Sequence, residues 1–168
     1  MSDVGRSIKE GTGYGLIAGT VLGLGLVLAT VIDGGPPIIV FRSLASVLLG
    51  PAAFAQTPAA TAVVLGVITL QYFSAMFGLF YGVYNSALTL RTRRSLPREA
   101  AIGMIYGAMV WLVSFRLVVP LRWPWLLVVP AVPVFAMLVL LYGLPLGLLY
   151  ATAERHAVSR TRDIRSCC

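Results

Sequence analysis

Four long apolar stretches constrain this chain more than any other feature of its sequence. An α-helix rises about 1.5 Å per residue, so about 20 residues cross the hydrocarbon core of a bilayer. Each stretch is about that long or longer, and the sequence therefore predicts an all-α membrane protein built as a four-transmembrane-helix bundle. The four predicted spans are Tyr14–Ile32, Thr61–Leu88, Ala100–Val119 and Trp125–Ala151.

The composition favours the same fold class. Of the 168 residues, 58% are hydrophobic and only 11% are charged, whereas a soluble domain carries about a quarter charged residues. Four spans leave little chain for a soluble domain, so we expect residues 1–168 to form one membrane domain. The net charge of +7 does not indicate nucleic-acid binding, because the basic residues flank the apolar spans.

The arginines and lysines predict which side of the membrane each loop occupies. If the N-terminus is cytoplasmic, all but three of the 13 basic residues lie in cytoplasmic segments, the exceptions being Arg42, Arg116 and Arg122. Basic residues are enriched on the cytoplasmic side. We therefore expect both termini, including the tail 152–168, to be cytoplasmic.

The longest connection, between the first and second spans, contains a short apolar segment, Ile38–Gly50. It is too short to cross a bilayer, and Arg42, Ser43 and Ser46 share one helical face. The pattern predicts a short amphipathic helix on the outer surface. A re-entrant helix is the alternative, which is less favourable because Arg42 is costly deeper in the membrane.

Each predicted span also contains a Gly-x-x-x-Gly pair. Two glycines on one helix face let backbones touch, and close packing drives much of the association between helices in lipid. The predicted role of these pairs is helix packing in one leaflet, and the alternative is space for a ligand or a partner helix. The pairs are Gly15/Gly19, Gly78/Gly82, Gly103/Gly107 and Gly143/Gly147.

The glycine pairs further indicate an internal repeat. Gly78-Leu-Phe-Tyr-Gly82 resembles Gly143-Leu-Pro-Leu-Gly147, and the charged dipeptides Lys9-Glu10 and Arg98-Glu99 precede the other two pairs. The sequence therefore predicts two repeated helical hairpins, the first of which carries the segment Ile38–Gly50 as an insertion.

The second span has the most polar face within the membrane. Gln71, Ser74 and Asn85 lie at helical spacing on the same face as Tyr81. This stripe predicts hydrogen bonds between helices, worth about 1 kcal/mol each. The alternative is that it lines a polar path.

No pattern in the sequence predicts catalysis or a cofactor. The only histidine, His156, lies in the tail, and a single histidine does not make a metal or haem site. The segment Gly11–Gly19 loosely matches a dinucleotide fingerprint but lacks the preceding strand that the fingerprint needs. Cys167 and Cys168 are adjacent and form no disulfide framework; whether they are modified stays open.

Three motifs resemble those of an uncharacterised family of small four-helix prokaryotic integral membrane proteins. They are Phe77-Gly78-Leu-Phe-Tyr81-Gly82, Gly103-Met-Ile-Tyr106-Gly107 and Tyr142-Gly143-Leu-Pro-Leu-Gly147. The resemblance covers most of residues 12–152. It implies the four-helix topology and a place in the inner (plasma) membrane of a prokaryote, but no activity. The family often has a histidine before the glycine pairs of its second and fourth helices, where this chain has Gln71-Tyr72 and Leu140-Leu141.

These patterns lead us to expect a non-enzymatic protein without a cofactor. We expect it to be a structural or accessory subunit that packs against lipids and against other membrane proteins or itself. The alternative is a transporter or channel for small molecules or lipids that works as an oligomer. A cofactor-binding membrane enzyme ranks third.

The orientation can be tested by labelling single cysteines in a variant that lacks Cys167 and Cys168. A membrane-impermeant reagent added outside should modify a cysteine at Ala52 or Gln56 and spare one at Ser95. The reverse pattern would overturn the orientation.

Overall fold

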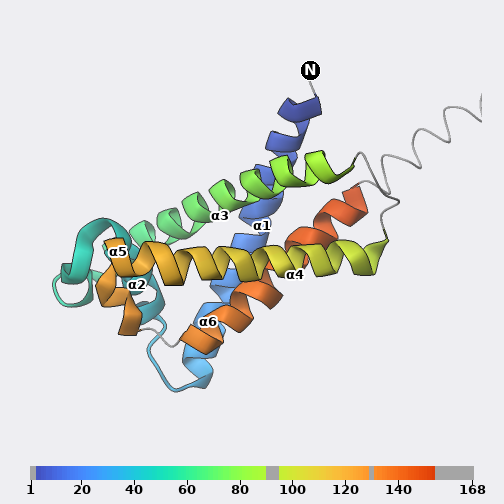
Figure 1. Cartoon of the computed structure of the whole chain (residues 1–168). Helices are drawn as coiled ribbons and strands as arrows, with labels where there is room; N and C mark the ends of the chain where they lie inside the picture. The colour runs from blue at the N-terminus through green and yellow to red at the C-terminus, as the bar shows by residue number, and fades with distance from the viewer. Residues whose placement is uncertain (1–2, 90–94, 129–130, 154–168) are drawn as a thin grey trace, which may run out of the picture.

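A computed structural model describes residues 3–89, 95–128 and 131–153, and every regular element in these ranges is helical (Figure 1). Four helices in them are long and apolar enough to cross a membrane, which confirms the all-helical class and the number of candidate spans. Their apolar ranges are Lys9–Ile32, Ala59–Asn85, Leu96–Arg122 and Val132–Ala153. Most of the predicted tail, with His156, Cys167 and Cys168, lies outside the described residues.

The first two spans are single uninterrupted helices. α1 covers Asp3–Ile32 and α3 covers Ala59–Thr89, so both extend beyond the predicted ranges. Helical hydrogen bonding does not have to end where the apolar residues do. Between them lie α2, Ile38–Leu49, and a short 3₁₀ helix, Gly50–Phe54.

The third span contains a π-helical segment. α4, Leu96–Val113, continues through the π segment η2, Ser114–Val118, into α5, Val119–Arg122. The sequence predicted that the third span ends at Val119, just before Pro120. The helix instead continues through Pro120 to Arg122. Proline cannot donate a backbone hydrogen bond and its ring clashes with the preceding turn, and the wider π turn before it gives that ring room.

The fourth span repeats this feature and begins later than predicted. Trp125 belongs to a 3₁₀ helix, Pro124–Val128, and the long helix starts with α6, Ala131–Met137. A second π segment, η4, covers Leu138–Gly143, and the helix then continues over residues 144–153. Pro145 follows η4 closely, as Pro120 follows η2.

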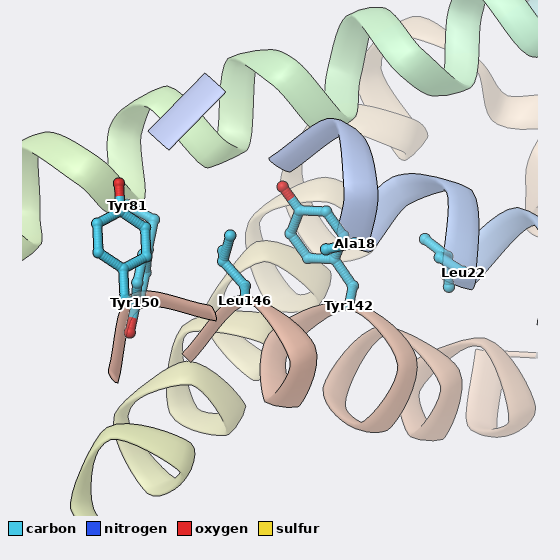
Figure 2. Packing of buried hydrophobic residues seen from close by; sticks show 6 residues of the cluster. All are labelled: Ala18, Leu22, Tyr81, Tyr142, Leu146 and Tyr150. Carbon is cyan, nitrogen blue, oxygen red and sulfur yellow. The ribbon is translucent and has the colours of Figure 1, made fainter. Parts of the chain in front are cut away.

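The core of the bundle lies between α1, α3 and the last helix, as Figure 2 shows. α1 packs along α3 and also against η4, and α4 packs against η4 as well. The buried cluster consists of Ala18, Leu22, Tyr81, Tyr142, Leu146 and Tyr150. Three of these six side chains are tyrosines, so the core is more aromatic and polar than that of a leucine-rich soluble bundle.

The outer surface of the bundle is apolar. Leu24, Leu121 and Val132 are exposed over 67%, 79% and 78% of their surface, and only 22% of each span's most apolar window is buried inside the protein. Soluble monomers rarely expose apolar patches this extensive. The exposed side chains suit lipid surroundings.

α2 has its polar side turned toward the protein. Ser46 is fully buried, whereas Ile39 and Leu48 are 45% and 59% exposed. The indole Nε1 of Trp125 donates to Ser46 Oγ at 3.2 Å, and that of Trp123 donates to the Val47 carbonyl oxygen at 3.1 Å. A surface helix with its polar face in water would show the opposite arrangement. The difference arises because these indoles need acceptors, and α2 supplies them.

Candidate functional site

α1 and α3 touch backbone to backbone where their glycines meet. A Cβ atom built on Gly15 would lie 2.8 Å from the Cα of Gly78, closer than real side chains approach. One built on Gly11 would lie 2.6 Å from the Gly78 carbonyl oxygen, and one on Gly78 would meet the Gly11 carbonyl oxygen in return. No side chain larger than hydrogen fits between these helices without a shift.

The third and fourth spans meet in the same way. A Cβ on Gly103 would lie 2.9 Å from the Cα of Gly147, and one on Gly107 would lie 3.3 Å from the Cα of Gly143. Gly103 and Gly143 also face each other's carbonyl oxygens. This geometry points Cα hydrogens at carbonyl oxygens, and each such contact is worth about 0.5–1 kcal/mol.

The two remaining predicted glycines also lie at helix contacts. A Cβ on Gly19 would collide with the side chain of Ser74, and the Cα of Gly82 lies 3.1 Å from the Cβ position of Gly11. All eight glycines singled out from the sequence therefore lie where two helices approach each other. Gly66, which the sequence did not single out, packs in the same way against the backbone of Phe41 in α2.

Beside the glycine contacts lies a cluster of tyrosines contributed by all four spans. The ring of Tyr150 lies 5.1 Å from those of both Tyr14 and Tyr81, and the Tyr81 ring lies 4.9 Å from that of Tyr106, all in edge-to-face geometry. Such pairs contribute about 0.5–1.5 kcal/mol beyond the area they bury. Sequence reasoning placed Tyr81 on the polar face of the second span and predicted no tyrosine cluster. The signal it missed is that each of these tyrosines lies within a turn of a glycine pair.

Two tyrosine hydroxyl groups hold α3 to the second half of the chain. The Tyr142 hydroxyl donates to the Ser74 carbonyl oxygen at 2.8 Å, and the Tyr106 hydroxyl donates to the Phe77 carbonyl oxygen at 2.6 Å. The two acceptors lie one turn apart on α3, while the donors come from α4 and η4. These bonds connect the third and fourth spans to the second.

In the predicted polar stripe of α3, Gln71 and Ser74 both lie against Gly19 of α1, and the Gln71 Oε1 is buried there without a hydrogen-bond partner. Gln71 Nε2 donates to Thr20 Oγ1 of α1 at 2.9 Å, and Ser74 lies buried against Gly19. Asn85 is also buried, only 3% exposed, beyond Tyr81. The structure therefore does not bring the three side chains together into one polar centre.

An acidic residue that sequence reasoning did not treat as a site residue lies buried at the start of α4. Glu99 is 3% exposed, and its carbonyl oxygen meets the Cβ position of Gly147. A carboxylate in the first turn of a helix is stabilised by the helix dipole. The described residues contain no group of three histidine, cysteine or acidic side chains that could hold a metal ion.

A comparison of the chain with protein-family models, curated proteins and solved structures finds no match. The resemblance to small four-helix prokaryotic membrane proteins stays a prediction from its motifs.

The glycine contacts predict that a change to alanine destabilises the protein at Gly15 and Gly103 but not at Gly13. Gly15→Ala and Gly103→Ala should each lower the free energy of unfolding in detergent by about 1–3 kcal/mol, because a methyl group overpacks the contact. Gly13→Ala is the matched control: Gly13 is exposed, with no atom within 4 Å of its Cβ position. It should be neutral or stabilising by up to about 1 kcal/mol, the usual helix preference for alanine. Equal effects at all three positions would refute the close contact.

The tyrosine hydroxyls predict a smaller effect. Tyr142→Phe and Tyr106→Phe should each cost about 0.5–1.5 kcal/mol, since each removes one hydrogen bond and keeps the ring. Tyr72→Phe is the control, because Tyr72 is 65% exposed and should leave the thermal midpoint unchanged. A midpoint that does not move for either buried tyrosine would exclude this role.

Proposed function

We propose that this chain is a non-enzymatic integral membrane protein that works as a structural or accessory subunit. One observation carries the proposal: the glycine pairs, two tyrosine hydroxyls and the Gln71 amide nitrogen make contacts between its own helices, while apolar side chains cover the outside. Such a surface is suited to lipids and to other membrane proteins, or to further copies of the chain.

The distribution of the polar stripe supports an accessory role over transport. A transport path needs polar groups that line one route across the membrane. Here Gln71 bonds to α1, Ser74 packs under Gly19 and its carbonyl accepts from Tyr142. A transporter or channel that works as an oligomer stays the alternative, and the experiment below separates the two.

We propose the orientation with both termini cytoplasmic in a prokaryotic plasma membrane. The basic residues support the orientation, since Arg42, Arg116 and Arg122 alone fall on the opposite side, and the motif resemblance supports the prokaryotic membrane. In this orientation α2 and the two indoles bonded to it lie at the outer interface. Tryptophan is enriched at that level of membrane proteins.

We also propose that the two hairpins are copies of one unit, and the glycine contacts support this. A Cβ on Gly15 meets the Ser74 carbonyl oxygen and the Gly78 backbone, and a Cβ on Gly103 meets the Gly143 carbonyl oxygen and the Gly147 backbone. Gly78 thus corresponds to Gly147, one turn from the alignment that the sequence suggested.

The tyrosines agree with this correspondence. One turn past Gly78 and Gly147 come Tyr81 and Tyr150, and these two rings contact each other. Equivalent residues meet in this way at a pseudo-two-fold axis between two copies.

The proposal is tested by purification from native membranes in a gentle detergent, followed by mass spectrometry of the co-purifying proteins. We expect larger membrane subunits in a fixed ratio to this chain, or further copies of it, with no solute flux in proteoliposomes. The double variant Gln71→Leu, Asn85→Leu should keep the complex assembled, with a loss of about 1 kcal/mol per hydrogen bond between helices. The control is Tyr72→Leu, which changes an exposed neighbour of Gln71.

Transport would give a different result. A specific solute flux in wild-type proteoliposomes that the double variant abolishes while its helical content and thermal midpoint are retained would defeat the accessory role. The control should then retain the flux.

A further inference from the structure

The outward face of α2 is apolar. Ile39, Leu48 and Leu49 are 45%, 59% and 43% exposed, and no polar side chain of this helix is as exposed as these three. Apolar surface of this kind is unfavourable in water, so the face should be covered by something apolar. The surroundings that could cover it are lipid acyl chains, a second copy of the chain or another membrane protein.

The three polar side chains of α2 all form hydrogen bonds within the protein. Arg42 Nη1 donates to the Phe54 carbonyl oxygen at 2.9 Å. Ser43 Oγ donates to the Ile39 carbonyl oxygen at 2.8 Å. Ser46 Oγ donates to the Ser43 carbonyl oxygen at 2.7 Å and also accepts from the indole described above. Each of these side chains therefore has a partner that does not come from water.

The backbone at the start of α2 is also suited to apolar surroundings. The first N–H groups of a helix have no partner within it and often bond to water. Here Pro36 and Pro37 have no N–H group, and the amides of Ile39 and Val40 donate to the carbonyl oxygens of these prolines at 3.0 and 3.3 Å. Unsatisfied backbone groups are costly in lipid, so these bonds lower the cost of placing α2 there.

The contact with α3 sets the depth of α2. A Cβ atom on Gly66 would lie 2.7 Å from the Phe41 carbonyl oxygen, and Gly66 comes seven residues after Ala59, where the apolar range of α3 begins. That range has 27 residues, about seven more than the roughly 20 that cross a bilayer. Gly66 therefore lies at the edge of the hydrocarbon core even if the whole excess is on this side. It lies deeper if α3 is tilted or the excess is shared between the two sides.

The part of α3 on which α2 packs is itself exposed to the surroundings of the bundle. Val64, Val67 and Ile68, all within two residues of Gly66, are 57%, 41% and 54% exposed. Apolar side chains exposed on a spanning helix face lipid. A helix that packs on α3 at this level with its own apolar side outward meets the same surroundings.

We propose that α2 is embedded in one leaflet of the membrane and that lipid acyl chains cover Ile39, Leu48 and Leu49. The leaflet is the one at the end of the bundle where α1 ends and α3 begins (Figure 1). Arg42 made this the less favourable arrangement in the sequence. Its Nε is buried and its Nη1 bonds to Phe54, so its charge lies on the protein side of α2.

This proposal depends neither on the accessory role nor on the orientation of the termini. A transporter with the same α2 would have the same lipid-facing surface, in whichever leaflet α2 lies. Co-purification of partner subunits and the labelling of loops therefore do not bear on it.

The test places nitroxide spin labels on single cysteines of the full chain, in a variant without the two C-terminal cysteines, reconstituted in phospholipid bilayers. Collisions are measured with O₂, which concentrates in hydrocarbon, and with a neutral, water-soluble nickel chelate. Labels at Ile39 and Leu48 should collide often with O₂ and rarely with the chelate. Their ratio of collision rates should match that of a label at Leu24, which is 67% exposed on α1. A label at Gln56, exposed between the 3₁₀ helix and α3, is the control for water and should collide often with the chelate.

Two results would overturn the proposal. Frequent collisions with the chelate at Ile39 and Leu48, as at Gln56, would place this face of α2 in water. Few collisions with either reagent at these positions, while the label at Leu24 still collides with O₂, would show that protein covers the face. The helical content and thermal midpoint of each labelled variant are compared with those of the unlabelled chain, and Leu49 replaces any position at which the label disturbs folding.

Discussion

The architecture of this chain depends on direct contact between helix backbones at glycine. Lipid surrounds apolar side chains as well as another helix does, so helices in a bilayer gain little from burying leucine. The backbones touch at Gly15 and Gly78 and again at Gly103 and Gly147. The close packing there stabilises the association of the helices, which burial of leucine in lipid does not. Tyrosine rings from all four spans pack against one another beside these contacts, and the hydroxyls of Tyr106 and Tyr142 bond to carbonyl groups of α3.

The sequence predicted the features that follow from length and residue size. Uninterrupted apolar runs predicted the four spans, and the spacing of Gly103 and Gly107 predicted a packed helix face, which is where the structure has its contact with the fourth span. The start of the fourth helix was predicted too early. The indole of Trp125 looks like part of an apolar run, but it belongs to a 3₁₀ turn bonded to Ser46.

Other features depend on which helices become neighbours, and single-helix patterns do not contain that information. The inward polar side of α2 requires the tryptophans of a loop about 80 residues away in the chain. The π segments before Pro120 and Pro145 keep helices intact where proline alone suggests an end or a bend. The tyrosine cluster needs the register between all four spans, and that register is set by the glycines.

The central claim concerns the distance between glycine backbones, and nuclear magnetic resonance measures it directly. The sample is deuterated so that only glycine carries protons at Cα. The nuclear Overhauser effect then gives a cross-peak between two Hα atoms that lie within about 5 Å of each other. The contacts in the structure predict cross-peaks between Gly15 and Gly78 and between Gly103 and Gly147, and none from Gly13 to another helix. If spectra with resolved glycine signals lacked both interhelical cross-peaks, the helices would not touch there and the account of the bundle would be wrong.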